Sequence, residues 1–280
     1  MKPVQELEFG GGLGDIIHQC YAGTYYKYLD RAGVDYARAK VFLVTHNPGA
    51  IELFKWHPKK DLFDVVECGY WLPHQNKEMR GKWGIPPQPA VIDTKGPVVF
   101  YPSPEDLEIL KAVEGRRFVV IAQAAGMHDR NLDPQWTKAL CVRLVEEFGV
   151  DVALTGKNYG RYGRTEDMLG LTGRGIHEFI DRLSVPGTLR LLQQSVGLVT
   201  CHSAMNLAGW HMRKPQLLLY PKSVYDRHFA RGDQWSFGRS FPETHHACWD
   251  DKALVEKKVN GFLMEIKAWS PSPILSTPAK

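Results

Sequence analysis

The sequence contains few cysteines and no motif that would use them. The five cysteines are scattered over 280 residues, at Cys20, Cys68, Cys141, Cys201 and Cys248. No Cys-x-x-Cys pair occurs, so neither a disulfide framework nor a zinc knuckle is indicated. A reducing compartment is the simplest setting for such a chain, and we expect a cytoplasmic protein.

The chain also lacks a long apolar run and a strong charge of one sign. No stretch is apolar over the length that crosses a bilayer, and the first residues lack the core of a signal peptide. The formal net charge of +4 suits an anionic ligand but does not by itself indicate nucleic acid. Nothing in the sequence indicates an oligomeric state.

The most informative local pattern is a glycine-rich turn near the N-terminus. Val4–Phe9 is typical of a short strand, and from Asp15 to Tyr28 apolar residues recur at three- and four-residue steps, which predicts an amphipathic helix. A strand, a glycine turn and a helix in this order direct backbone N–H groups and the positive end of the helix toward an anion. The glycines of the turn, which allow a ligand to approach closely, are Gly10, Gly11, Gly12 and Gly14.

This turn does not match the two common nucleotide-binding motifs. The dinucleotide fingerprint needs a third glycine where Ile17 stands and an acid after the next strand, yet Thr45-His46-Asn47 follows the predicted strand Lys40–Val44. The Gly-Lys-Ser/Thr of ATPase phosphate loops is absent. The turn therefore predicts a ligand near a helix N-terminus but no particular cofactor. A plain turn, with Asp15 as a helix cap, is the alternative.

Strands and helices alternate through the second half of the chain. The predicted strands span Arg117–Ala122, Val150–Leu154, Gly197–Thr200 and Leu217–Tyr220. The first contains the fully apolar run Phe118–Ile121, of the kind buried in parallel sheets. The pattern predicts a parallel sheet covered on both faces. Its ligand should lie beyond the carboxyl ends of the strands, at Gln123, Thr155 and Cys201.

Other segments are less regular. We expect a strand at Val98–Tyr101, a strand end at Leu171–Gly173, irregular chain from Pro221 and a helix at Leu254–Phe262. Trp71–Trp83 is rich in aromatic and basic residues, and we interpret it as a surface loop or as a flap that binds an acceptor. The prolines at residues 102–104 predict a domain boundary, which gives an N-terminal domain 1–104, a C-terminal domain 105–268 and a disordered tail 269–280.

The order of several motifs is similar to that of a known family. They are Gly12-Leu13-Gly14-Asp15, Pro134-Gln135-Trp136, Ala153-Leu154-Thr155-Gly156, Gly170-Leu171-Thr172-Gly173, and Val199 to Ala208 followed by Lys214-Pro215. Over about residues 4–220 the chain resembles the heptosyltransferases of lipopolysaccharide assembly, glycosyltransferase family nine. The resemblance implies the GT-B fold, an α/β architecture of two Rossmann-like domains whose parallel sheets face a central cleft. It also implies transfer of a sugar, with inversion, from a nucleotide diphosphate donor.

One motif departs from the family pattern. Where the family usually has Asp-Ser/Thr-Gly-x-x-His, this chain has Cys201-His202-Ser203-Ala204-Met205-Asn206. The aspartate, glycine and histidine are replaced together, which leaves the sugar and the nucleotide open and also leaves open whether the motif retains catalysis.

The resemblance implies roles for individual residues. Asp15 stands at the position of the family's proposed general base, in the domain expected to hold a carbohydrate acceptor. In the other domain, the N–H groups that follow Cys201, together with Arg130 and Lys157, would stabilise the leaving diphosphate. The residues expected to bind the nucleotide-sugar are Gly12, Leu13, Gly14, Gln123, Arg130, Thr155, Gly156, Lys157, His202, Ser203, Ala204 and Asn206.

Three alternatives remain at this stage. The chain could be a nucleotide- or sugar-binding protein with the same fold and no catalysis, since its last motif is altered. It could instead transfer sugar to modified DNA, because the Trp71–Trp83 segment is basic and aromatic. His245, His246 and Cys248 could bind a metal, but their spacing matches no standard zinc motif, so the sequence predicts a metal-independent transferase.

Overall fold

The computed structural model describes two parallel sheets in two compact units. It describes residues 6–10, 12–21, 39–44, 48–58, 60–67, 99–124, 131–156, 171, 173–201, 203–222 and 244–269. One unit comprises Met1–Leu107 and Ser184–Arg190, and the other comprises Glu108–Leu183 and Leu191–Lys280. The predicted domain boundary at residue 104 stays a prediction. The segment Trp71–Trp83 and residues 270–280 of the predicted tail lie outside the described residues.

The first unit contains a three-stranded parallel sheet. The strands β1 (Glu6–Gly10), β2 (Ala39–Val44) and β3 (Phe63–Glu67) are arranged in the order β1-β2-β3. The helix α1 (Leu13–Tyr21) follows β1 directly, and the short helix α3 (Glu52–Lys55) precedes β3. The predicted strand–turn–helix at the N-terminus is therefore confirmed as far as Tyr21.

The starts of two further helices belong to the same unit. They are the helix α5 (Pro104–Leu110) and the helix α7 (Val185–Gln194). The Glu52 carboxylate accepts a 2.7 Å hydrogen bond from the backbone N–H of Val185. A segment from the second half of the sequence is thus fixed to the first unit by groups that the sequence pattern does not connect.

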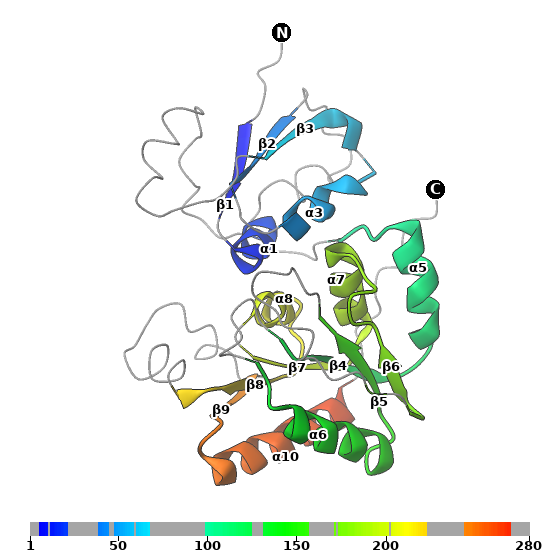
Figure 1. Ribbon diagram of the computed structural model, residues 1–280, viewed down its shortest axis with the longest axis vertical. Helices are drawn as coiled ribbons and strands as arrows, with labels where there is room; N and C mark the ends of the chain where they lie inside the picture. The colour runs from blue at the N-terminus through cyan, green and yellow to red at the C-terminus, as the bar shows by residue number, and fades with distance from the viewer. Residues whose placement is uncertain are drawn as a thin grey trace. The chain divides into compact units, whose positions relative to one another are not determined.

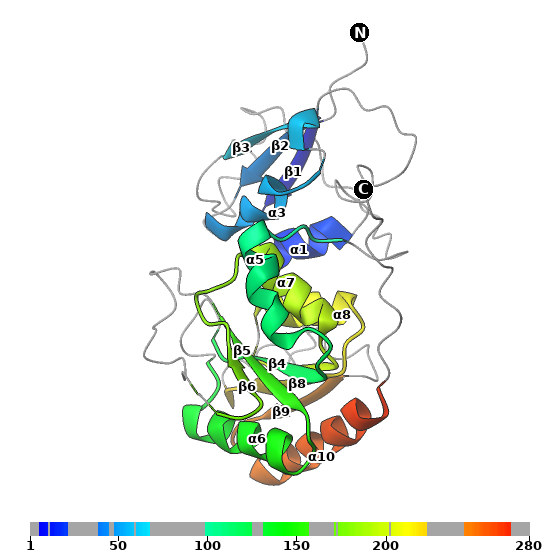
Figure 2. The ribbon, with the colours of Figure 1, turned by 90° about the vertical axis from the view of Figure 1, so that its right-hand side faces the viewer.

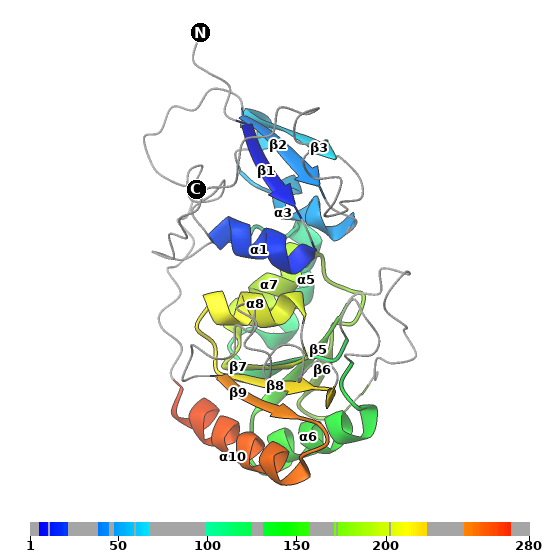
Figure 3. The ribbon, with the colours of Figure 1, turned by 90° about the vertical axis from the view of Figure 1, so that its left-hand side faces the viewer.

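The second unit contains a six-stranded sheet with the order β6-β5-β4-β7-β8-β9, in which every pair is parallel. Helices α6 and α10 lie along one face of this sheet, and α8 lies on the other (Figures 1, 2 and 3). The α/β architecture predicted from the alternating pattern is confirmed. The elements are β4 (Phe118–Ala122), α6 (Pro134–Glu146), β5 (Asp151–Thr155), β6 (Ile176–Glu178), β7 (Gly197–Thr200), α8 (Ala204–His211), β8 (Gln216–Tyr220), β9 (Thr244–Cys248) and α10 (Lys252–Ala268).

The core of this unit lies between the sheet and the helices α6 and α10. All residues of β4, β7 and β8 are buried, as expected for strands covered on both faces. Leu140 and Leu144 of α6 are buried against the sheet, and Trp136 and Phe148 pack at the edge of the same cluster. These four residues, spaced four positions apart, form the apolar side of α6 and of the chain that directly follows it. The described cysteines form no disulfide with one another.

Three local predictions were wrong. Val99–Tyr101 forms no strand, because Phe100 alone is buried and Pro102 leads the chain directly into the cap of α5. At the expected strand end, the described residues Leu171 and Gly173 belong to no strand of the sheet; Gly173 bridges to Ile176, where the strand β6 (Ile176–Glu178) begins. The strand β9 lies in a segment predicted to be irregular. Both β6 and β9 are edge strands, which are held by backbone hydrogen bonds and need little apolar sequence.

Candidate functional site

The turn between β1 and α1 has the geometry that the sequence predicts. The backbone N–H of Ile16 donates to the carbonyl of Gly12 at 3.1 Å, so the helix begins at once after the glycines. Ile16, Ile17 and Cys20 are buried and hold α1 in place. Burial also raises the pKa of the Cys20 thiol, which makes this cysteine a packing group rather than a nucleophile. Asp15 lies in the first turn of the helix.

The other predicted residues come from the carboxyl edge of the larger sheet. The strand β4 ends at Ala122, which stands opposite Thr155 of β5 on one side and Thr200 of β7 on the other. Gln123 follows with no exposed surface, and its carbonyl accepts the N–H of Leu132 at 2.9 Å. The parallel register therefore brings residues from three strands to one edge, as ligand sites of such sheets require.

The two threonines differ in one respect. The Thr200 hydroxyl donates to the carbonyl of Ala122 at 3.1 Å. Thr155 is only 1% exposed, yet its hydroxyl has no hydrogen-bond partner in the described part of the chain. Buried hydroxyl groups are nearly always hydrogen-bonded, so the Thr155 hydroxyl can receive a polar atom of a ligand.

The helix α8 begins at the same edge, directly after β7. Its N-cap residue Ser203 has extended backbone angles but makes no side-chain capping bond. The Ser203 hydroxyl lies 3.2 Å from the hydroxyl of Thr200 instead. The first-turn N–H groups of α8, beginning at Ala204, are therefore not capped by this side chain, and together with the helix dipole they favour an anion.

Asn206 is placed differently from Ser203 and Ala204. Asn206 is 3% exposed, and it lies in the first turn of α8, which packs against β8. The side-chain amide of Gln216 donates to the backbone carbonyl of Asn206 at 3.1 Å and accepts from the N–H of Trp210 at 2.9 Å. Thus the first turn of α8 is tied to the neighbouring strand, which fixes the direction of the helix.

The structure brings together five of the predicted donor-binding residues in the second unit, namely Gln123, Thr155, Gly156, Ser203 and Ala204. The turn residues Gly12, Leu13 and Gly14 belong to the first unit. Arg130, Lys157 and His202 lie outside the described residues. Thr200 was not among the predicted site residues, although it ends a buried strand, as Thr155 does.

No cluster of metal ligands is found in the described ranges. No three His, Cys, Asp or Glu side chains converge there in a way that could hold an ion. His245 of β9 lies beside α10, where its Nε2 atom is 2.7 Å from a carboxylate oxygen of Glu265. None of the helices in the described part combines the length and apolar character needed to cross a bilayer.

The fold defines a class: it is the α/β fold of the GT-B glycosyltransferases. Among solved structures, the chain is similar to ADP-heptose LPS heptosyltransferase II of E. coli, with 14% identity, 94% of this chain and 99% of that chain covered, and a TM-score of 0.57. It is also similar to a family nine glycosyltransferase of Veillonella parvula, with 10% identity, coverage of 95% and 99%, and a TM-score of 0.56. The E. coli heptosyltransferase WaaC with ADP gives 10% identity, coverage of 95% and 100%, and a TM-score of 0.50.

These solved structures are of sugar-transferring enzymes. At such low identity the likeness establishes the fold, which agrees with the architecture that the motif order implied. No protein-family model matches the chain, and no curated protein sequence matches it significantly.

Proposed function

We propose that the protein is an inverting glycosyltransferase that moves a sugar from a nucleoside diphosphate donor to an acceptor hydroxyl of a carbohydrate. The observation that carries the proposal is the fold shared with heptosyltransferase II over nearly the whole of both chains. That enzyme is named for ADP-heptose, and WaaC was solved with ADP. An ADP-linked sugar is therefore the first donor to test.

Asp15 is the proposed general base. It lies in the first turn of a helix that directly follows a strand and a glycine turn, and Ile16 and Ile17 anchor this turn in the core. An aspartate so placed would accept the proton of the acceptor hydroxyl as the sugar is transferred. Positioned general bases of this kind contribute about 10²–10⁴-fold to rate.

The carboxyl edge of the larger sheet is the proposed donor site. The leaving diphosphate needs preorganised positive charge, which the first turn of α8, with His202, Ser203 and Ala204, would supply in part. Arg130 and Lys157 are the proposed side-chain partners of the phosphates. The hydroxyl of Thr155, which has no partner among the residues that the structure describes, would contribute to binding of the nucleotide or the sugar, together with Gln123, Gly156 and Asn206.

The proposed reaction does not require a metal ion, because helix and side-chain charge would stabilise the leaving group. Activity should then persist in excess EDTA. Loss of activity in EDTA, with recovery on addition of a divalent cation, would contradict this part of the proposal.

The first experiment measures nucleotide binding and then turnover. Thermal shift with ADP, UDP, GDP and CDP should show stabilisation by one of them. Hydrolysis of the matching nucleotide-sugar should fall about 10²–10⁴-fold in Asp15→Asn, while nucleotide binding is retained. Asp61→Asn is the matched control, because Asp61 is an exposed aspartate of the same unit.

Other outcomes support the alternatives. Nucleotide binding without hydrolysis or transfer to any acceptor would indicate a binding protein. Salt-dependent binding of duplex DNA, lost in an Arg80→Ala and Lys82→Ala double variant, would indicate a transferase that acts on DNA.

A further inference from the structure

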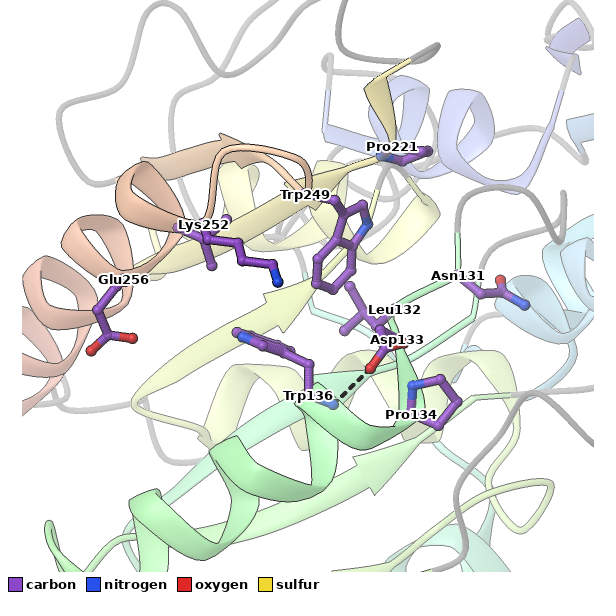
Figure 4. Close-up of a pocket in the computed structure, with 10 residues that line it drawn as sticks. Asn131, Leu132, Asp133, Pro134, Trp136, Pro221, Trp249, Lys252 and Glu256 are labelled. Carbon is purple, nitrogen blue, oxygen red and sulfur yellow. Dashed lines mark hydrogen bonds between the residues drawn. The ribbon is translucent and has the colours of Figure 1, made fainter.

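A pocket of about 850 Å³ lies in the second unit, at the start of helices α6 and α10 (Figure 4). Its walls come from the segment that enters α6, from Pro221 after β8 and from Trp249 after β9. The volume lies within the range of small-molecule sites, which is about 300–1,000 Å³. The helices α6 and α10, which contribute residues to the pocket, lie on one face of the sheet, whereas α8 lies on the opposite face (Figures 1 and 3).

Two tryptophans form the central wall of the pocket. The rings of Trp136 and Trp249 meet edge to face, with centroids 5.4 Å apart and an interplanar angle of 85°. Their backbones are fixed, because the N–H of Trp136 donates to Asp133 at 2.7 Å and that of Trp249 donates to the carbonyl of Tyr220 at 2.9 Å. Both residues are half-buried, and neither indole N–H donates to any residue that the structure describes.

The polar groups of the pocket mix donors with acceptors. Figure 4 shows the Lys252 ammonium directed into the space beside the two indoles, and Lys252 forms no ion pair with the described residues. Asp133 and Glu256 supply carboxylates, of which Glu256 also pairs with Arg143 at 2.8 Å. Because the Arg143 guanidinium offsets the charge of Glu256, one carboxylate and one ammonium remain, and the lining is close to neutral.

The charges and the hydrogen-bonding groups of the lining decide which class of ligand fits the pocket. The helix N-termini at the pocket do not favour an anion, because Asp133 caps α6 and Asp251 caps α10 with their own carboxylates. A phosphate would therefore meet a capping carboxylate at each of these helix N-termini. A sugar hydroxyl, in contrast, both donates and accepts hydrogen bonds, and the C–H groups of a sugar ring pack favourably on the negative face of an indole.

We infer that this pocket is a binding site for a neutral saccharide, separate from the proposed donor site. The indole rings provide the apolar wall, the indole N–H groups and Lys252 donate to hydroxyl oxygens, and Asp133 and Glu256 accept from hydroxyl groups. The inference does not depend on catalysis by this protein, because binding can be measured without turnover.

Saturation-transfer NMR on the full chain tests the site with four neutral probes: maltotriose, cellobiose, lactose and methyl α-mannopyranoside. At least one should receive saturation. For the best probe, Kd should rise about three- to tenfold in Lys252→Ala and in Trp249→Phe, which keeps the aromatic ring but loses the N–H donor. Lys257→Ala is the matched control, since Lys257 is an exposed lysine of the same helix outside the pocket.

Three results would overturn the inference. They are no saturation of any probe, equal binding by wild type and both pocket variants, and displacement of the bound sugar by ADP, which would place the sugar in a nucleotide site. Binding of ADP to the sugar-free protein reports on the proposed donor site alone, so failure of the two proposals can be told apart.

Discussion

The carboxylate of Asp106 accepts a 2.8 Å hydrogen bond from the backbone N–H of Ser184, a residue 78 positions further along the chain. The same carboxylate accepts the N–H of Ser103 at 2.8 Å, and the Ser103 hydroxyl accepts the N–H of Asp106 at 3.0 Å, which is a reciprocal capping box at the start of α5. Ser184 in turn caps α7, since its hydroxyl accepts the N–H of Gly187 at 3.1 Å. One buried carboxylate thus joins the first turns of two helices.

Replacing Asp106 with asparagine should destabilise the protein. The side chain is 2% exposed, and an asparagine places an N–H₂ donor where backbone donors already converge. Hydrogen bonds to a charged group contribute about 1.5–3 kcal/mol, so we expect the free energy of unfolding to fall by about 2–3 kcal/mol in urea titrations. Glu105→Gln, on the exposed side of the same turn, should change it by less than about 0.5 kcal/mol. Equal effects of the two substitutions would contradict the proposed role of Asp106.

The two threonines at the sheet edge should respond in opposite ways to substitution by valine. Thr155→Val removes a buried hydroxyl that has no partner in the described structure, so the free energy of unfolding should stay constant or rise by about 1 kcal/mol. Thr200→Val removes the hydrogen bond to the carbonyl of Ala122, so it should cost about 1 kcal/mol.

Ligand binding provides the second measurement on this pair. If the Thr155 hydroxyl receives the donor, Thr155→Val should weaken ADP binding about three- to tenfold by isothermal titration, although the protein is no less stable. Unchanged affinity would remove Thr155 from the proposed donor site.

Lys214 should make stability depend on pH in the alkaline range. Its ammonium donates to the carbonyls of Gln193 at 2.8 Å and Ser195 at 2.6 Å, and burial lowers the pKa of Lys214 to about 8. Since the unfolded lysine titrates near 10.4, the unfolded chain binds more protons between these pH values. The contribution of Lys214 to the free energy of unfolding therefore rises with pH over that interval.

The contribution of Lys214 is measured as the difference in the free energy of unfolding between wild type and Lys214→Met. We expect this difference to change by about 2–3 kcal/mol in favour of wild type between pH 7.5 and 10.5, measured by urea unfolding at each pH. The exposed Lys138 of α6 provides the control variant Lys138→Met. If the free energy of unfolding depended on pH in the same way in wild type and in Lys214→Met, the buried amine would not be the source of the pH dependence.

Gly197 should not tolerate a side chain, because β7 passes close to α10. A Cβ atom there would lie 2.8 Å from Ile266 and 3.0 Å from Phe262. We expect Gly197→Ala to lower the free energy of unfolding by about 1–3 kcal/mol. Gly173→Ala, whose Cβ would meet only Ile176 at 3.8 Å, should be nearly neutral. An unchanged free energy of unfolding in Gly197→Ala would contradict this expectation, because it would mean that α10 can move away from the added Cβ without loss of stability.

The parts of the fold that the sequence predicted are those with strong local patterns. The apolar runs ending at Ala122, Thr200 and Tyr220 identify buried parallel strands, because such strands need apolar residues on both faces. The edge strand β9 carries Thr244, two histidines and a cysteine, and its place depends on backbone pairing with β8, which no local pattern reveals.

The sequence alone determined the α/β class, the parallel order of strands and helices, and the turn that places Asp15 at a helix start, since periodicity and glycine spacing are local properties of the chain. The tertiary structure alone decided which polar groups lack a partner and which segments meet. The Thr155 hydroxyl has no hydrogen-bond partner among the described residues, the Asp106 carboxylate joins two helices, and the indoles of Trp136 and Trp249 meet; all three features depend on residues far apart in the sequence. Hydrogen bonds and pockets are satisfied or left open only when the sheet register and the helix packing are fixed.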